Sequence, residues 1–97
     1  MNSNAIVIDS DGSVRNVRPT NGISFTLEEL RRILGVRMVQ VIDMPDDGLI
    51  AIVDEEGFLR PDEERNKWAT AVLRRHCFIS ERGILGSVML AADTAVR

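Results

Sequence analysis

Acidic side chains gather in one part of the sequence, between residues 43 and 64. Nine of the fifteen acidic residues lie there against a single basic one, Arg60, so the segment carries a formal charge of −8. The nine are Asp43, Asp46, Asp47, Asp54, Glu55, Glu56, Asp62, Glu63 and Glu64. Such carboxylates could exchange protons, hold a divalent cation, or form an acidic surface for a basic partner, even a crude mimic of nucleic-acid phosphates. Solvated turns explain the same pattern, and we favour that interpretation over the others.

Other combinations of reactive residues give weaker signals. His76 and Cys77 are the only histidine and cysteine, which excludes an internal disulfide and the common zinc patterns. As neighbours on a helix they would point about 100° apart, a poor geometry for proton transfer. Residues 9–12 resemble the start of a calcium loop, but Thr20 stands where its glutamate should be. The glycine spacing in 83–86 resembles that of a phosphate-binding loop, but the segment has no lysine to contact a phosphate. We therefore expect no catalytic residue, metal or cofactor.

Arginines offer an alternative kind of site. The chain has eleven of them and one lysine, and a guanidinium can hold phosphate through paired N–H groups. The residues of this ligand-binding alternative are Arg37, Asn66, Arg74 and Arg75, with Arg82 as a further phosphate contact and Trp68 stacking on a base. A nucleotide signal is the ligand that this set would suit.

Asn66 and Trp68 each have two interpretations. Asn66 should lie in the first turn of a helix, where its side chain could bind the turn at 55–57 or a ligand, and we favour the turn. Trp68, the only tryptophan, is either a wedge in the core or an exposed anchor for a partner. The sequence does not decide between these two roles for Trp68.

Several local patterns define the elements that would position these residues. Residues 5–8 and 14–18 predict a hairpin, and residues 27–34 a helix. Thr26 and Glu29 match a capping box, Phe25 and Leu30 a hydrophobic staple, and Gly35 a left-handed helix end. The apolar face of this helix should contain Leu27, Leu30, Ile33 and Leu34.

The second half of the chain predicts strands and one longer helix. Residues 36–43 and 49–53 should form a hairpin, and the unbroken apolar run 49–53 indicates a strand covered on both faces. Residues 58–59 could pair briefly, and a helix should cover 63–75 with Asp62 as its N-cap and Ala69, Val72 and Leu73 on its apolar stripe. Residues 76–79 should be buried, 84–90 should form a last strand with a possible bulge at Gly86, and 91–97 a tail.

Length and composition favour one soluble domain. With 97 residues, 44% of them apolar and 28% charged, the chain can bury one core, and no apolar run is long enough to cross a membrane. The N-terminus lacks the basic and apolar regions of a signal peptide, so we expect a cytoplasmic protein. The predicted fold is α+β, a four- to five-stranded and mainly antiparallel sheet with two helices packed on it.

The order of several short motifs resembles a family of small phage- and plasmid-borne proteins that is classified as a domain of unknown function. The motifs are the glycine-ended helix 25–35, the strand at 39–41, the turn 53–57, Asn66 with Ala69 and Thr70, and Gly86 in an apolar strand, so the resemblance spans residues 25–90. The chain departs from the family pattern at 36–38, at Gln40 and at Asp54, so a polar ligand contact through the strand or the turn is less expected in this chain. The resemblance implies a place in phages and mobile elements that act inside bacteria.

These observations lead to a functional hypothesis with two alternatives. We expect an accessory protein that binds a host protein or ribonucleoprotein complex, as an inhibitor of a bacterial defence system of the CRISPR or restriction type. Its partner-binding residues would be Asp46, Asp47, Asp54, Glu55, Glu56, Asp62, Glu63 and Trp68. Direct nucleic-acid binding and membrane association are not expected. The alternatives are a protein that binds a nucleotide signal, and a structural module that forms a homodimer through an edge strand.

Overall fold

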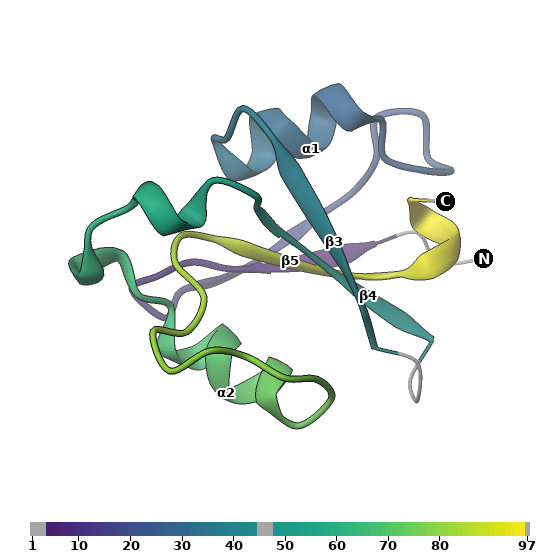
Figure 1. Ribbon diagram of the computed structural model, residues 1–97. Helices are drawn as coiled ribbons and strands as arrows, with labels where there is room; N and C mark the ends of the chain where they lie inside the picture. Colours follow the sequence, from purple (N-terminus) through teal and green to yellow (C-terminus); the bar gives the residue numbers. More distant parts are fainter. Residues whose placement is uncertain (1–3, 45–47, 97) are drawn as a thin grey trace.

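The computed structural model, which describes residues 4–44 and 48–96, contains a five-stranded antiparallel sheet with two helices (Figure 1). The strands are β1 (Ala5–Ile8), β2 (Val14–Val17), β3 (Val39–Met44), β4 (Leu49–Asp54) and β5 (Val88–Ala92), and the helices are α1 (Leu27–Leu34) and α2 (Lys67–Arg74). Three short 3-10 helices complete the fold: η1 (Gly57–Leu59), η2 (Asp62–Glu64) and η3 (Asp93–Ala95). The predicted α+β class is confirmed.

Strand β5 joins two hairpins that are distant in sequence. The spatial order is β2-β1-β5-β4-β3, so the C-terminal strand pairs with β1 on one side and with β4 on the other. Both predicted hairpins, β1–β2 and β3–β4, are present. The sheet therefore ends in β2 at one edge and in β3 at the other.

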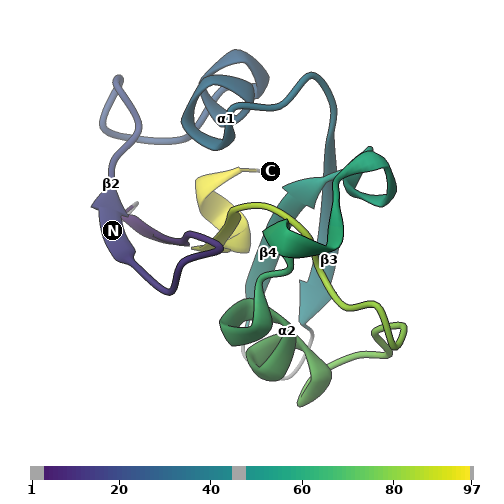
Figure 2. The same cartoon turned by 90° about the vertical axis from the view of Figure 1, so that its left-hand side faces the viewer.

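The two helices cover opposite faces of the sheet, as the end-on view shows (Figure 2). Ile50 and Ile52 of β4 belong to the apolar cluster that packs on α1, whereas Ala51 and Val53 belong to the cluster that packs on α2. The prediction that β4 is covered on both faces is confirmed. Because successive strand residues point to opposite faces, an unbroken apolar run is what this position requires.

Helix α1 begins and ends as its sequence predicts. Thr26 Oγ1 accepts from the Glu29 amide at 3.1 Å while Glu29 Oε1 accepts from the Thr26 amide at 3.0 Å, and Gly35 has a left-handed φ of 68°. Phe25 and Leu30 are both buried in the same cluster, as a hydrophobic staple should be. The predicted apolar face was wrong at Leu27: this first residue of the helix is 51% exposed, whereas Leu30 and Leu34 are buried.

Glu29 also fastens the preceding loop to the helix, which gives stability a pH dependence. Its Oε2 accepts from the amide and the hydroxyl of Thr20, both at 2.8 Å. Hydrogen bonds from the Thr26 amide and then from Thr20 lower the pKa of Glu29 from 4.5 to about 2. Since the folded-state pKa is depressed, this contribution to stability is complete above the unfolded-state value and is lost as the pH falls toward 2.

Glu29→Gln should therefore be less stable than the natural chain near neutral pH, and should lose less stability on acidification between about pH 5 and pH 3. Urea unfolding at several pH values measures both effects. Glu28→Gln, at the exposed neighbouring position, is the matched control and should follow the natural chain. Parallel pH curves for Glu29→Gln and the natural chain would contradict this role of Glu29.

Helix α2 starts later than predicted, and Asp62 is not its N-cap. Residues 62–64 form η2 instead, and the helix N-cap is Asn66, whose Oδ1 accepts from the Ala69 amide at 3.0 Å. The physical reason is a tertiary pairing: Arg65 forms a β-bridge with Leu85, which holds residue 65 in an extended conformation that no helix tolerates. The predicted stripe is buried at Ala69 and Leu73, whereas Val72 is exposed.

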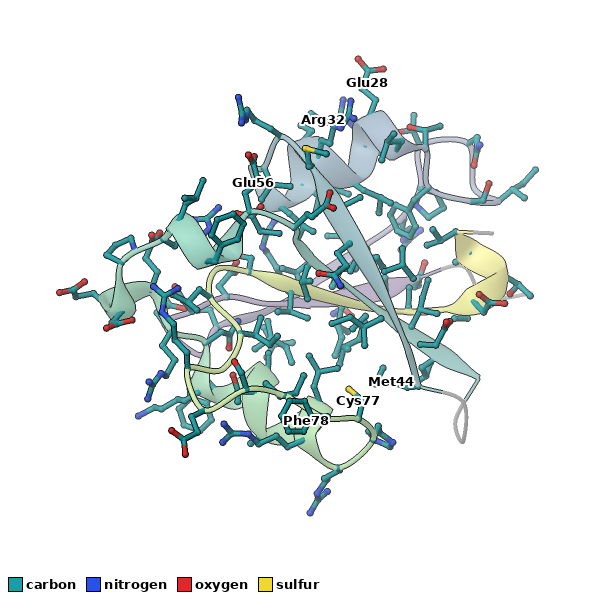
Figure 3. All side chains as sticks on the ribbon, viewed as in Figure 1. Glu28, Arg32, Met44, Glu56, Cys77 and Phe78 are labelled. Atoms are coloured by element: carbon teal, nitrogen blue, oxygen red, sulfur yellow. The ribbon has the colours of Figure 1, made fainter. Side chains whose placement is uncertain are left out.

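Other predictions for the second half of the chain were wrong in place or in burial. Residues 58–59 belong to η1 and not to a strand, because the chain turns away from the sheet after Asp54. Within 76–79, Phe78 is 92% exposed, and Figure 3 shows it and Cys77 on the α2 side of the molecule. Met44, which lies just beyond the predicted strand 36–43, is the last residue of β3 and is buried in the cluster that packs on α2.

The C-terminal residues complete the core and do not form a tail. Strand β5 is shifted relative to the predicted 84–90, with Gly86 before it in a left-handed conformation (φ 86°). Ala91 and Ala95 are buried, and the Ala95 carbonyl accepts from the Phe25 amide at 2.8 Å. Residues 91–96 thus complete the cluster that packs on α1, with Ala91 and Ala95 buried in it and Val96 packed against it.

Candidate functional site

The acidic stretch after β4 is held together by arginines. Asp54, whose side chain is 8% exposed, accepts from Arg60 Nε at 2.8 Å and from the Glu56 amide at 2.9 Å. Arg60 Nη1 also donates to Glu64 Oε1 at 3.0 Å. The hydrogen bond from Arg60 to Asp54 raises the pKa of Arg60. One guanidinium therefore neutralises much of the charge of two carboxylates and fixes the turn between them.

Two further arginines, from other parts of the chain, form hydrogen bonds to this turn and to the residues that follow it. Arg37 binds Glu56 through two N–H···O contacts of 3.1 and 2.7 Å, and these hydrogen bonds lower the pKa of Glu56. Arg82 donates through Nε to Asp62 at 2.9 Å, through Nη1 to the Phe58 carbonyl at 2.9 Å, and through Nη2 to the Arg60 carbonyl. Three arginines thus bind four carboxylates of the segment: Asp54, Glu56, Asp62 and Glu64.

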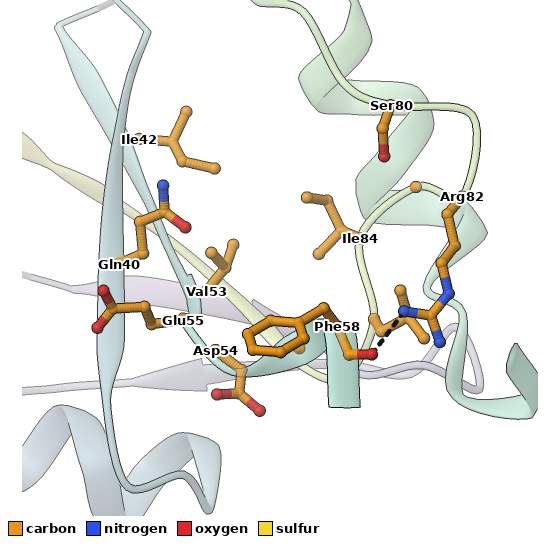
Figure 4. Close-up of a pocket in the computed structure, with 12 residues that line it drawn as sticks. Gln40, Ile42, Val53, Asp54, Glu55, Phe58, Ser80, Arg82 and Ile84 are labelled. Atoms are coloured by element: carbon orange, nitrogen blue, oxygen red, sulfur yellow. Dashed lines mark hydrogen bonds between the residues drawn. The ribbon is translucent and has the colours of Figure 1, made fainter. Parts of the chain in front are cut away.

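A hollow of about 250 Å³ lies between the edge strand β3, the turn after β4 and residues 80–85 (Figure 4). Ile42, Val53, Phe58 and Ile84 supply apolar walls. Polar groups of Gln40, Glu55 and Ser80 stand around them, with Arg82 bound to the Phe58 carbonyl at one side. An apolar hollow with a polar surround can accept a side chain of a partner.

Helix η1 forms a ridge beside this hollow. Phe58 and Leu59 are 70% and 68% exposed, although they are large apolar residues next to each other. Phe58 lines the hollow just described, and Leu59 lines a second, shallower one that includes Val36 and Arg37. We call Phe58, Leu59 and the two hollows the η1 ridge. It combines exposed apolar area with a backbone that Arg60 and Arg82 hold in place.

The partner-binding residues predicted from sequence have different positions. Asp54, Glu56 and Asp62 are bound to arginines, whereas Glu55 and Glu63 are exposed. Asp46 and Asp47 lie outside the residues that the structure describes. Of the predicted acidic surface, Glu55 and Glu63 are the members in 4–44 and 48–96 that stay exposed outside these arginine pairs.

Trp68 lies on another part of the surface. It is 51% exposed, and Lys67 Nζ lies 5.2 Å from the centre of its ring. The indole packs on Gly12 in the β1–β2 turn so closely that a Cβ there would be 2.5 Å from Nε1. Trp68 is thus neither fully core nor fully free, and its ring covers the first hairpin rather than the η1 ridge.

The residues of the ligand-binding alternative do not line one common cavity. Arg37 is paired with Glu56, and Arg74 Nη2 donates to the carbonyl oxygens of Ser80 and Glu81 at 2.8 and 3.4 Å. Asn66 is fully buried, and Arg75 is exposed at the end of α2. A ligand would have to displace these internal hydrogen bonds to recruit the same side chains.

Asn66 binds a different part of the fold from the turn at 55–57 that its sequence position suggested. Its Nδ2 donates to the carbonyl oxygens of Ile8 at 2.8 Å and Gly86 at 2.9 Å, while Oδ1 caps α2. One buried side chain thereby joins β1, the segment before β5 and the start of α2. That pairing is not encoded within any local window of sequence.

Sequence reasoning missed the main residues of the η1 ridge. The sequence suggests brief strand pairing for Phe58 and Leu59 and gives no sign that both are exposed. Ile42 and Ile84 are distant in sequence, and only tertiary packing brings them to the same hollow. A signal was present: two large apolar residues stand between Gly57 and Pro61 in an otherwise acidic stretch, where no periodicity gives them a core-facing side.

Within 4–44 and 48–96, no three histidine, cysteine or acidic residues come together in a way that could hold a metal ion. No helix in the described part of the chain has the length and apolar character needed to cross a bilayer. Cys77 is partly buried, with Sγ 3.4 Å from the Leu73 carbonyl.

Comparisons of the chain with protein-family models, curated proteins and solved structures find no match.

Proposed function

We propose that this protein acts by binding a host protein or ribonucleoprotein complex through the η1 ridge. The observation that supports the proposal most directly is the pair Phe58 and Leu59, exposed together on a braced 3-10 turn. Exposed apolar residues with neighbouring pockets are typical of interaction sites, and a rigid support reduces the entropy lost on binding. The exposed Glu55 and Glu63 on the same segment favour a partner with basic groups around an apolar centre.

The setting implied by the family resemblance suggests what this partner would be. In a phage or mobile-element protein acting in the bacterial cytoplasm, a component of a CRISPR or restriction system is the target that we propose. Inhibition would follow from occupying a surface that the target needs for its own function. The nucleotide-binding alternative receives less support, because Arg37, Asn66 and Arg74 already donate to groups within the fold.

Replacing both Phe58 and Leu59 with alanine should reduce capture of the partner from bacterial lysate at least tenfold. Hot-spot truncations of this kind commonly cost about 2 kcal/mol or more each. Because both side chains are exposed, the variant should keep the circular dichroism spectrum of the natural chain. Quantitative mass spectrometry of the captured proteins gives the measurement.

Two further variants separate the apolar from the acidic contribution. Ile23→Ala removes a similarly exposed apolar side chain outside the ridge and should leave capture unchanged. Glu55→Lys with Glu63→Lys reverses the exposed charge and should weaken capture mainly at low salt. Capture that is empty at low salt, or that survives the loss of both Phe58 and Leu59, would count against the proposal.

A further inference from the structure

The two edges of the sheet differ in how they are protected. Strand β2 is four residues long and carries Arg15, with Arg18 directly after it. Strand β3 is six residues long and is uncharged from Val39 to Ile42, with no proline or glycine. In Figure 1 β3 passes in front of β4 and β5, nearest to the viewer. Charged or short edges discourage strand pairing, so β3 is the edge that is open to it.

The backbone groups that β3 presents at this edge follow from its pairing with β4. The Glu55 amide donates to the Met38 carbonyl at 3.0 Å, so these two residues form a hydrogen-bonded pair. The next pair along the strands is Val39 with Asp54, and the one after it is Gln40 with Val53. Hydrogen-bonded positions alternate along an antiparallel pair. The backbone N–H and C=O groups therefore point toward β4 at Met38, Gln40, Ile42 and Met44. At Val39, Val41 and Asp43 these backbone groups point outward, away from β4.

We propose that two copies of this chain pair antiparallel through β3, with Val39 of one copy opposite Val41 of the other. The outward groups of Val39 and Val41 in each copy then exchange hydrogen bonds with those of the second copy. The two five-stranded sheets become one continuous sheet around a two-fold axis, and the same surface is used on both copies, as a two-fold dimer requires.

Self-complementarity of the side chains selects this register. Arg37, which precedes β3 and binds Glu56 of its own copy, lies opposite Asp43 of the second copy, so a guanidinium held by one carboxylate meets another at both ends of the paired segment. Met38 lies opposite Ile42, and Gln40 lies opposite Gln40 of the second copy, where two amides can exchange hydrogen bonds. Each of these side chains is exposed or partly exposed. Apolar groups therefore meet apolar groups, and polar groups meet matching polar groups.

The neighbouring registers match less well. Hydrogen bonds between the two copies form only where Val39, Val41 or Asp43 of one copy lies opposite one of these same three residues of the other. Pairing Val41 with itself would put Asp43 against Val39 and Gln40 against Ile42. Pairing Val39 with itself would put Arg37 against Val41 and Met38 against Gln40. Both arrangements bring a charged or amide group against an apolar one, so charge and polarity favour the proposed register.

Because the two-fold axis passes next to Gln40, this residue offers a direct test. Gln40→Lys and Gln40→Glu each place like charges opposite each other across the axis, so each variant alone should dimerise at least tenfold more weakly than the natural chain. An equimolar mixture of the two should recover a heterodimer. Sedimentation velocity over a concentration series from about 5 to 500 µM, at low ionic strength, measures the association.

The opposite edge supplies matched controls. Asn16→Lys and Asn16→Glu introduce the same charges at an exposed position of β2 and should leave self-association unchanged. A natural chain that stays monomeric at the highest concentration would overturn the proposal, as would a mixture of the Gln40 variants that fails to associate. Gln40 and Ile42 of this edge also line the first hollow of the η1 ridge, so a second variant separates the two proposals: Phe58→Ala with Leu59→Ala should abolish partner capture and leave the dimer intact.

Discussion

Asn66→Ala should lower the free energy of unfolding by about 3–4 kcal/mol, the largest effect that we expect from a single substitution here. The change removes the cap of α2, which alone contributes about 1 kcal/mol. It also leaves the buried carbonyl groups of Ile8 and Gly86 without their donor, and each such loss costs about 1 kcal/mol or more. Urea unfolding followed by circular dichroism provides the measurement.

Asn66→Asp distinguishes the two tasks of this side chain. Aspartate caps a helix as well as asparagine does, so a role limited to capping predicts a nearly neutral change. The structure predicts instead a loss at least as large as that of alanine at neutral pH, because a carboxylate would face the carbonyl oxygens of Ile8 and Gly86 at hydrogen-bond distance. An aspartate variant as stable as the natural chain would show that the two Nδ2 hydrogen bonds contribute little.

Arg60→Met should lower the free energy of unfolding by about 2 kcal/mol, since it leaves the mostly buried carboxylate of Asp54 without its guanidinium. The methionine retains much of the apolar length of the side chain, so the loss reports on charge and hydrogen bonding. Because the turn that carries Phe58 also loses a brace, partner capture should weaken as well. Unfolding in urea and capture from lysate measure the two effects separately.

Arg15→Met is the matched control for this prediction. Arg15 also binds a carboxylate, Asp9, through Nε at 3.1 Å, but their side chains are 46% and 27% exposed. Exposed ion pairs contribute about 0–1 kcal/mol because water and salt screen them. Equal losses for the Arg15 and Arg60 variants would mean that burial of Asp54 does not set the strength of its pairing.

What the sequence determined were features that depend on neighbours in the chain. The capping box of Thr26 and Glu29, the end of α1 at Gly35, and the hairpins are local, because their hydrogen bonds join residues a few positions apart. The apolar run of β4 was equally informative, since only a strand covered on both faces requires it. These patterns were enough to predict the α+β class.

Only the tertiary structure decided how distant segments meet. The start of α2 at Asn66 depends on the bridge between Arg65 and Leu85, and the central place of β5 depends on its pairing with both β1 and β4. Local propensity favoured a helix from residue 63, and a long-range backbone pairing overrode it.

The candidate site shows the same division. Composition identified the acidic stretch, but an isolated sequence does not reveal that Arg37 and Arg82, which are distant in the chain, bind its Glu56 and Asp62. Nor does it reveal that Phe58 is left exposed beside a hollow lined by β3 and residues 80–85. Charge counts are a property of the sequence, whereas the pairing and exposure of those charges depend on which segments the fold brings together.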